Sequence, residues 1–137
     1  MDALLTDEGW QRLHAAAVEV MGRAYAPYSG FPVGVAAHAD DGRLLTGCNV
    51  ENASYPVGLC AECGLVSDLA RTGGGQLVAV WCVGPDGETL MPCGRCRQLL
   101  WEHGGERCRI QTPEGERSLA EILPQAFGAH DLTKGAR

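Results

Sequence analysis

The stretch Leu77-Val78-Ala79-Val80-Trp81-Cys82-Val83 is a continuous apolar run that contains several β-branched residues. A run of this kind between turn signals is typical of a strand that is buried on both faces. Gly73-Gly74-Gly75 precede it and Pro85-Asp86-Gly87 follow it, and both triplets favour turns. The run therefore predicts a central strand around which the other elements are arranged.

Helical and extended patterns flank this strand on both sides. Apolar residues three and four apart predict helices at 10–24 and 60–71, and another helix is expected from Cys93 to His103. Extended patterns predict strands at 31–38, 44–50 and 108–111, with a hairpin turn at Asp40-Asp41-Gly42, and a last helical segment is expected at 119–123. This order predicts a single domain over residues 1–137 with an α/β fold, a three-layer α/β/α sandwich around a mixed central sheet.

The composition is that of a globular chain, since 45% of the 137 residues are hydrophobic and 20% are charged. The longest apolar runs are too short to cross a bilayer, and the first residues lack a secretory-signal pattern. We therefore expect a cytoplasmic protein that does not bind membranes. The formal net charge is −6 and the basic residues are scattered, which disfavours nucleic acid as a partner. A small neutral ligand agrees better with this charge.

The seven cysteines are the next signal, because a chain in a reducing compartment rarely pairs them as disulfides. Cys93 and Cys96 stand at i and i+3 directly after Pro92, at an expected helix start that favours thiolates. Cys60 stands at the start of another predicted helix, and Glu62 follows two residues later. Three protein ligands to Zn²⁺ leave the fourth tetrahedral position for water, as in catalytic zinc sites. The three cysteines are thus the candidate zinc ligands, and Glu62 is the candidate for proton transfer.

Longer segments accompany these residues. "YAPYSGFPVGVA" at 25–36 and "GCNVENASYP" at 47–56 are followed in order by "CAE" at 60–62 and "PCGRCRQ" at 92–98. With them the chain resembles the small, homotetrameric, zinc-dependent cytidine deaminases of nucleoside salvage over nearly its whole length. The resemblance implies hydrolysis of cytidine and 2'-deoxycytidine to uridine and 2'-deoxyuridine plus ammonia, in pyrimidine salvage. It also implies that zinc-bound hydroxide attacks C4 of cytosine while Glu62 shuttles the protons.

The resemblance further implies which residues bind the nucleoside. Asn49 and Glu51 match the residues that hold the ribose hydroxyls, and a paired amide and carboxylate suit that role chemically. Phe31 matches the aromatic residue that stacks on the pyrimidine ring. The backbone N–H of Ala61 is expected to contact the base carbonyl.

The assembly is implied by two other aromatic residues. Tyr55 and Phe127 match positions that reach an active site across a subunit boundary. The resemblance therefore implies a homotetramer whose active sites are shared between subunits, with a small nucleoside as the substrate.

One position departs from the family pattern. Many relatives have Arg directly after the catalytic Glu, where it hydrogen-bonds the ligand thiolates, and here that position is Cys63. We hypothesise that Arg95 or backbone N–H groups balance the thiolate charge instead. Cys63 also leaves an alternative open, because Cys60-Ala-Glu-Cys63 and Cys93-Gly-Arg-Cys96 together form the paired pattern of a closed structural zinc site.

Two other enzyme classes share the zinc motifs. A deaminase for another aminopyrimidine is disfavoured by the ribose-binding pair Asn49 and Glu51. A polynucleotide-editing deaminase typically has His as its first ligand, whereas this chain has Cys60 and a net negative charge. Of the remaining residues, Cys48, Cys82 and Cys108 are interpreted as core residues, and His14, His38, His103 and His130 as surface or helix-end residues.

Overall fold

The computed structural model describes residues 4–135. Its five-stranded sheet has the order β2-β1-β3-β4-β5. The strands are β1 (Gly34–Ala39), β2 (Leu44–Cys48), β3 (Leu77–Val83), β4 (Arg109–Thr112) and β5 (Gly115–Ser118). The predicted central strand is β3, which pairs antiparallel with β1 and parallel with β4. The prediction of a mixed central sheet is therefore confirmed.

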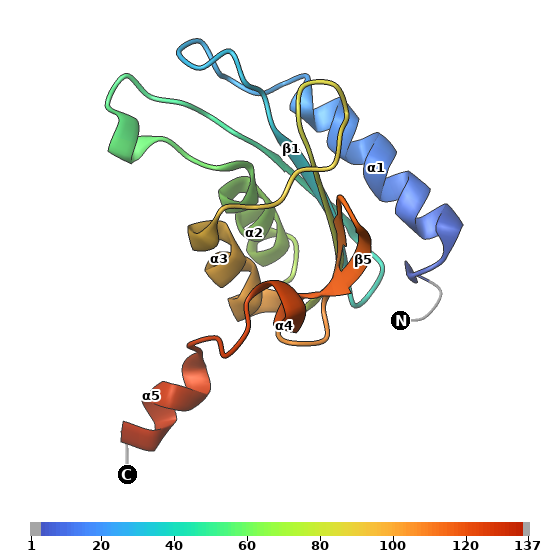
Figure 1. The fold of residues 1–137 in the computed structure, drawn as a ribbon, viewed down its shortest axis with the longest axis vertical. Helices are drawn as coiled ribbons and strands as arrows, with labels where there is room; N and C mark the ends of the chain where they lie inside the picture. Colours follow the sequence, from blue (N-terminus) through green and yellow to red (C-terminus); the bar gives the residue numbers. More distant parts are fainter. Residues whose placement is uncertain (1–3, 136–137) are drawn as a thin grey trace.

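Helices cover both faces of this sheet (Figure 1). They are α1 (Asp7–Met21), α2 (Ala61–Arg71), α3 (Gly94–Gly104), α4 (Leu119–Ile122) and α5 (Ala129–Gly135), with a 3-10 turn η2 (Tyr55–Val57). The α1 helix packs on one face against β1 and β3, whereas α2 and α3 lie together on the opposite face. This arrangement confirms the three-layer α/β/α prediction. Among the described residues, no helix has both the length and the apolar character that spanning a membrane requires.

Two apolar cores result, one on each face of the sheet. Side chains of a strand alternate between faces, so neighbouring residues of β3 belong to different cores. Ala79 and Val83 pack with the buried face of α1, and Val80 and Cys82 pack with α2 and α3. Both faces of β3 are thus buried, which explains why its sequence is an uninterrupted apolar run.

A glycine on β2 fixes how closely α2 approaches the sheet. A Cβ atom added at Gly47 would lie 2.2 Å from the carbonyl oxygen of Ala61 and 2.6 Å from the backbone nitrogen of Leu65. The first turn of α2 therefore rests directly on the backbone of β2. Since α2 carries Glu62 and begins after Cys60, this contact sets the height of both residues above the sheet.

The structure differs from the sequence prediction at three places. The strand β5 was not predicted, although it pairs antiparallel with β4 over four residues. The helix α5 was not predicted either, and it extends away from the body of the molecule (Figure 1). The interpretation of His38 as a surface or helix-end residue was wrong, because His38 lies inside β1 with none of its surface exposed. Its neighbours on β1 are small and apolar, so the strand is buried as a whole.

Candidate active site and metal centre

The N-termini of α2 and α3 bring three cysteines together. Cys60 is the N-cap of α2 and Cys93 the N-cap of α3, and Cys96 lies in the first turn of α3. Their three sulfur atoms lie within 4.8 Å of one another. Two segments that are far apart in the sequence thus place a compact set of sulfur donors at the junction of two helices.

The donor set fits a zinc ion. With Zn–S bonds of about 2.3 Å, the sulfurs of a tetrahedral site lie roughly 3.8 Å apart, which is compatible with this cluster. Cys63 is not a member of the cluster among the described residues. Its sulfur instead accepts a hydrogen bond from Nη1 of Arg95 at 3.6 Å. Three clustered sulfurs leave one of the four tetrahedral positions open. This arrangement argues against a structural zinc site with four cysteine ligands.

The pKa values of the three cysteines link metal binding to the release of protons. Burial raises the pKa of Cys60 and of Cys96, whereas hydrogen bonding to the backbone of Cys96 lowers the pKa of Cys93. Two of the three sulfurs therefore keep their protons until a cation stabilises the thiolates, so that metal binding releases protons. The guanidinium of Arg95 stands nearby, and its pKa is raised by the hydrogen bond to Cys63 and by attraction to Cys60 and Cys96.

Glu62 lies beside this cluster. Only 3% of the surface of Glu62 is exposed, which is rare for a residue with a carboxyl group. Its Oε1 accepts a hydrogen bond from the buried thiol of Cys82 on β3 at 3.4 Å. Hydrogen bonding to Glu62 also adds to the effect of burial in raising the pKa of Cys96, so the carboxyl group reaches the sulfur cluster. A buried acid next to a metal-binding cluster is placed to move protons rather than to be solvated.

Asn49 holds the loop before β1. Its Oδ1 accepts the backbone N–H of Val33 at 2.8 Å, and its Nδ2 donates to the carbonyl of Phe31 at 3.0 Å. The side chain therefore fixes the loop that carries Phe31, whose ring is half-exposed. One lone pair on the amide oxygen and one N–H bond remain for a ligand.

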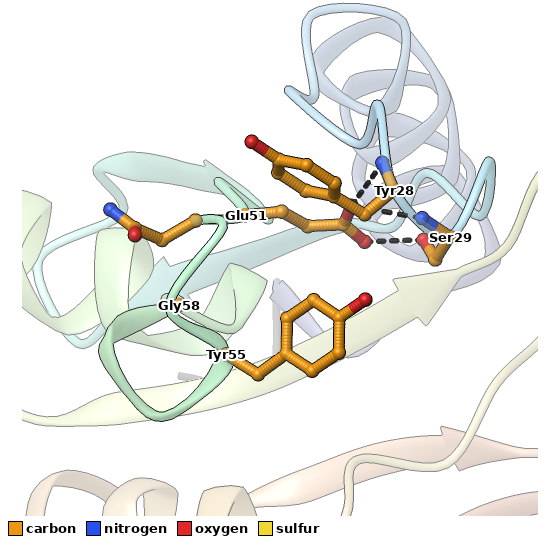
Figure 2. Close-up of a pocket in the computed structure, with 6 residues that line it drawn as sticks. Tyr28, Ser29, Glu51, Tyr55 and Gly58 are labelled. Atoms are coloured by element: carbon orange, nitrogen blue, oxygen red, sulfur yellow. Dashed lines mark hydrogen bonds between the residues drawn. The ribbon is translucent and has the colours of Figure 1, made fainter.

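Glu51 is held by the turn that contains Tyr28 and Ser29 (Figure 2). Its Oε1 accepts the backbone N–H groups of Tyr28 at 3.0 Å and Ser29 at 3.1 Å, and its Oε2 accepts the Ser29 hydroxyl. The hydrogen bond from the Ser29 side chain holds the pKa of Glu51 below its usual value. Glu51 is therefore a fixed, ionised acceptor at neutral pH.

Two cavities meet at Glu51 and Tyr55. One of about 250 Å³ is lined by Asn49, Glu51, Tyr55 and Cys60, together with Val50, Gly58 and Leu59. The other, of about 390 Å³, lies on the side of Tyr28 and Ser29 (Figure 2). The smaller cavity bears on the chemistry, because it joins the predicted ribose-binding residues to a candidate metal ligand.

Two predicted residues stand at the edge of this arrangement. Tyr55 is 74% exposed, and its ring meets that of Tyr28 edge-on with 6.3 Å between the centroids. Phe127 is 58% exposed, and its carbonyl accepts a hydrogen bond from Nε2 of Gln98 on α3. Phe127 does not line the smaller cavity, so within one chain it is not part of the candidate site.

Comparison with known proteins identifies the family. A family model, the cytidine and deoxycytidylate deaminase zinc-binding region, matches residues 8–112. The chain belongs to this family. The cytidine deaminase of Mycobacterium tuberculosis is 52% identical over 133 residues, which cover 97% of this chain and 100% of that protein.

Solved structures of the cytidine deaminase family share the fold. The crystal structure of cytidine deaminase from Mycobacterium leprae has 60% sequence identity and a TM-score of 0.84, covering 85% of this chain and 98% of that one. That from Mycobacterium tuberculosis has 54% identity and a TM-score of 0.86, with 90% and 98% covered. The resemblance to cytidine deaminases and the predicted α/β fold are thereby confirmed. The zinc-binding region and the cysteine cluster together confirm zinc as the cofactor.

Two contributors to the site were not predicted from sequence. Ser29 holds Glu51, and it belongs to the segment at 25–36 that carries the resemblance, so its position was a usable signal. Cys82 was interpreted only as a core residue, yet its thiol contacts Glu62. The alternation along the central strand would have placed Cys82 on one of the two helix-covered faces, but it could not have identified Glu62 as the partner of Cys82.

Proposed function

We propose that the chain catalyses the hydrolytic deamination of cytidine and 2'-deoxycytidine to uridine and 2'-deoxyuridine, with release of ammonia, in pyrimidine salvage. The observation that carries this proposal is the buried carboxyl group of Glu62 beside the cluster of Cys60, Cys93 and Cys96. Family membership supports it, since the curated relatives are named cytidine deaminases. A structural zinc site has no need of a buried acid.

Cys60, Cys93 and Cys96 would hold the metal, because their sulfurs form a set that fits Zn²⁺. When bound, zinc supplies a Lewis acid that lowers the pKa of a water molecule toward neutrality. Cys60 and Cys93 cap their helices, and so the metal would face the positive ends of two helix dipoles. Arg95 contributes a further positive charge close to the sulfurs.

Glu62 would move the protons of the reaction. The carboxylate accepts a proton as water adds to C4 of the cytosine ring, and it delivers a proton to N3. It then takes the remaining proton from the hydroxyl group at C4 and transfers it to the amino group. The C4–N bond breaks, ammonia leaves, and the oxygen from water remains at C4 as the carbonyl oxygen. One group serves as base and then as acid, which requires that it be close to the reacting atoms and sheltered from solvent.

The nucleoside would occupy the cavity that joins Cys60 to Asn49 and Glu51. Glu51 is a fixed acceptor for ribose hydroxyls, and Asn49 retains one donor and one acceptor for them. Phe31, which Asn49 positions through its carbonyl, would stack on the pyrimidine. Ala61 is the first residue of α2, and its N–H is among those that a helix leaves for an external acceptor such as the base carbonyl.

The exposed aromatic residues support a homotetramer with shared active sites. Tyr55 and Phe127 are exposed large hydrophobic side chains, so their rings are accessible to a neighbouring subunit. Tyr55 also lines the cavity beside Cys60, so a neighbouring subunit that covers Tyr55 would close this cavity. Phe127 would reach the site of a different subunit, since it lies away from the cavity of its own.

The test is to follow the ultraviolet absorbance of cytidine and of 2'-deoxycytidine during incubation with the zinc-loaded protein and with Glu62→Gln. We expect rapid conversion by the natural chain and a loss of turnover by at least roughly a thousandfold in the variant, because proton transfer fails in more than one step. The side chains have nearly the same size, so Glu62→Gln should retain its zinc. Zinc content and X-ray absorption are measured alongside.

The two measurements separate the alternatives. Turnover of nucleosides with three sulfur ligands and one lighter ligand at zinc supports the proposal. A folded, zinc-loaded chain that converts neither nucleoside refutes it, and four sulfur ligands would point to a structural site. Equal turnover by Glu62→Gln would refute the role of Glu62 alone.

A further inference from the structure

The buried thiol of Cys82 contacts the carboxyl group of Glu62, and the chemistry described above does not use it. The Sγ atom of Cys82 lies 3.4 Å from Oε1 of Glu62. Both residues are almost fully buried, with exposed fractions of 2% and 3%. A carboxylate that has lost its water needs protein donors, and each buried contact therefore carries weight.

The fold holds Cys82 rigidly. It lies in the central strand β3, directly opposite Val35 of β1. Its carbonyl accepts the backbone N–H of Leu90 at 2.9 Å. Alternation along β3 directs the thiol to the face covered by α2 and α3, where Glu62 projects from the first turn of α2. A donor on the middle strand of a sheet is positioned more precisely than one on a loop.

The chemistry of the thiol suits a donor. Burial raises the pKa of Cys82 far above its ordinary value, so the sulfur keeps its proton at physiological pH. A thiol is a weak donor, whereas a carboxylate is a strong acceptor. Cys96 also bonds Glu62, but as a thiolate bound to zinc it would have no proton to donate. Cys82 then remains as the donor to Glu62 from the protein interior.

We infer that Cys82 is a positioning residue: its S–H group anchors Oε1 of Glu62 and leaves the other carboxylate oxygen directed at the reacting water and base. The inference rests on the proposed role of Glu62 in deamination, and it adds a residue that this role requires. Cys82 itself touches neither substrate nor metal in this scheme. Its effect is to limit the rotation of the Glu62 side chain.

The kinetic test compares Cys82→Ala with Cys82→Ser, two replacements of nearly equal size that differ in one hydroxyl group. We expect Cys82→Ala to lower kcat for cytidine about tenfold, the loss that corresponds to one hydrogen bond to a charged group, with KM changed less than twofold. Cys82→Ser keeps a donor and should recover most of this loss. Neither variant introduces a larger side chain, so both should keep the fold and the zinc content, and Tm is measured for each to separate packing from positioning.

A purely structural role predicts a different result. If the two variants lose the same amount of kcat, or if kcat follows Tm, the loss comes from packing and the inference is overturned. An increase in KM with unchanged kcat would also overturn it, because substrate binding would then be affected instead of proton transfer.

Infrared spectroscopy tests the contact without any substrate. The S–H stretching band of Cys82 is isolated by subtracting the spectrum of zinc-loaded Cys82→Ala from that of the natural chain. We expect a band shifted to low frequency by hydrogen bonding, which moves toward the free-thiol position in Glu62→Gln because an amide is a weaker acceptor. A band at the free-thiol position in the natural chain would overturn the inference. This result stands even if the natural chain fails to convert cytidine, so the failure of each proposal can be recognised separately.

Discussion

A single methyl group at Gly47 tests whether the contact between β2 and α2 sets the geometry of the active site. The Cβ atom of Gly47→Ala would lie 2.2 Å from the carbonyl oxygen of Ala61 and 2.6 Å from the backbone nitrogen of Leu65. Real Cβ atoms almost never approach closer than 3.0 Å, so α2 has to move by roughly 1 Å. Both clashing atoms belong to the backbone, and no side chain can turn away to relieve the contact.

The size of the effect follows from this displacement. Overpacking of a well-filled core costs typically 1–3 kcal/mol, and we expect a cost of about 2–3 kcal/mol here because both clashing atoms are backbone atoms of α2. At the usual entropy of unfolding for a chain of this length, Tm falls by roughly 7–10 °C. The displacement also moves Cys60 and Glu62 relative to Cys93 and Cys96 on α3. A misplacement of about 1 Å costs on the order of a hundredfold in kcat/KM.

The control substitutes the glycine on the other side of the same contact. Gly64→Ala would place its Cβ atom 3.4 Å from Cα of Gly47, which is ordinary van der Waals contact. Gly64 lies inside α2, where alanine is favoured over glycine by up to about 1 kcal/mol, so Tm should stay or rise. Thermal unfolding and cytidine turnover are measured for both zinc-loaded variants at equal protein concentration, since bound metal and the proposed subunit association would both contribute to Tm.

The outcome that would refute the reasoning is simple to recognise. If Gly47→Ala matches Gly64→Ala in Tm and the natural chain in kcat/KM, the close approach does not determine the position of α2. A loss of Tm with unchanged kcat/KM would show that the contact stabilises the fold but does not align the site.

Two further predictions concern charges near the site. Arg95→Ala should weaken zinc binding roughly tenfold, measured by competition with a chelator. This is the low end of the effect for residues that support metal ligands, because Arg95 is exposed. Arg95→Lys should have an intermediate zinc affinity, and unchanged affinity in Arg95→Ala would assign the charge balance to backbone N–H groups. Ser29→Ala should raise the pKa of Glu51 toward its ordinary value, which a carboxyl-carbon NMR titration measures. When the pH is lowered, Glu51 should therefore become protonated at a higher pH in this variant than in the natural chain. The two backbone N–H donors remain in Ser29→Ala, so a pKa that does not move would show that they suffice.

The fold was largely predictable from the sequence because its central element is unambiguous. The apolar run of β3 is buried on both faces, and the amphipathic patterns of α1 and α2 supply the two covering layers. The strand β5 escaped prediction because its residues, Gly-Glu-Arg-Ser, carry no apolar alternation. Its place comes from pairing with β4 and from the ion pair of Glu116 with Arg109 at 2.8 Å, and neither contact can be read from local sequence.

In the candidate site, too, local sequence does not determine the contacts, as the two Cys-x-x-Cys segments show. In each, the first cysteine is an N-cap and the second lies three residues later in the first turn, so their local geometries are alike. Cys96 is fully buried and joins the cluster, whereas Cys63 is only partly buried and meets Arg95. The difference arises from the rotation of each helix about its own axis, which is set by packing.

That rotation decides what kind of site the helices form. The α2 helix rests on β2 at Gly47 and turns Glu62, not Cys63, into the buried interior beside the cluster. Had α2 been rotated so that Cys63 faced α3, four sulfurs would have closed the tetrahedron and left no position for water. The spacing of the cysteines is compatible with both outcomes. The close approach at Gly47 and the contact of Cys82 with Glu62 favour the open site, and both lie outside the metal-binding motif.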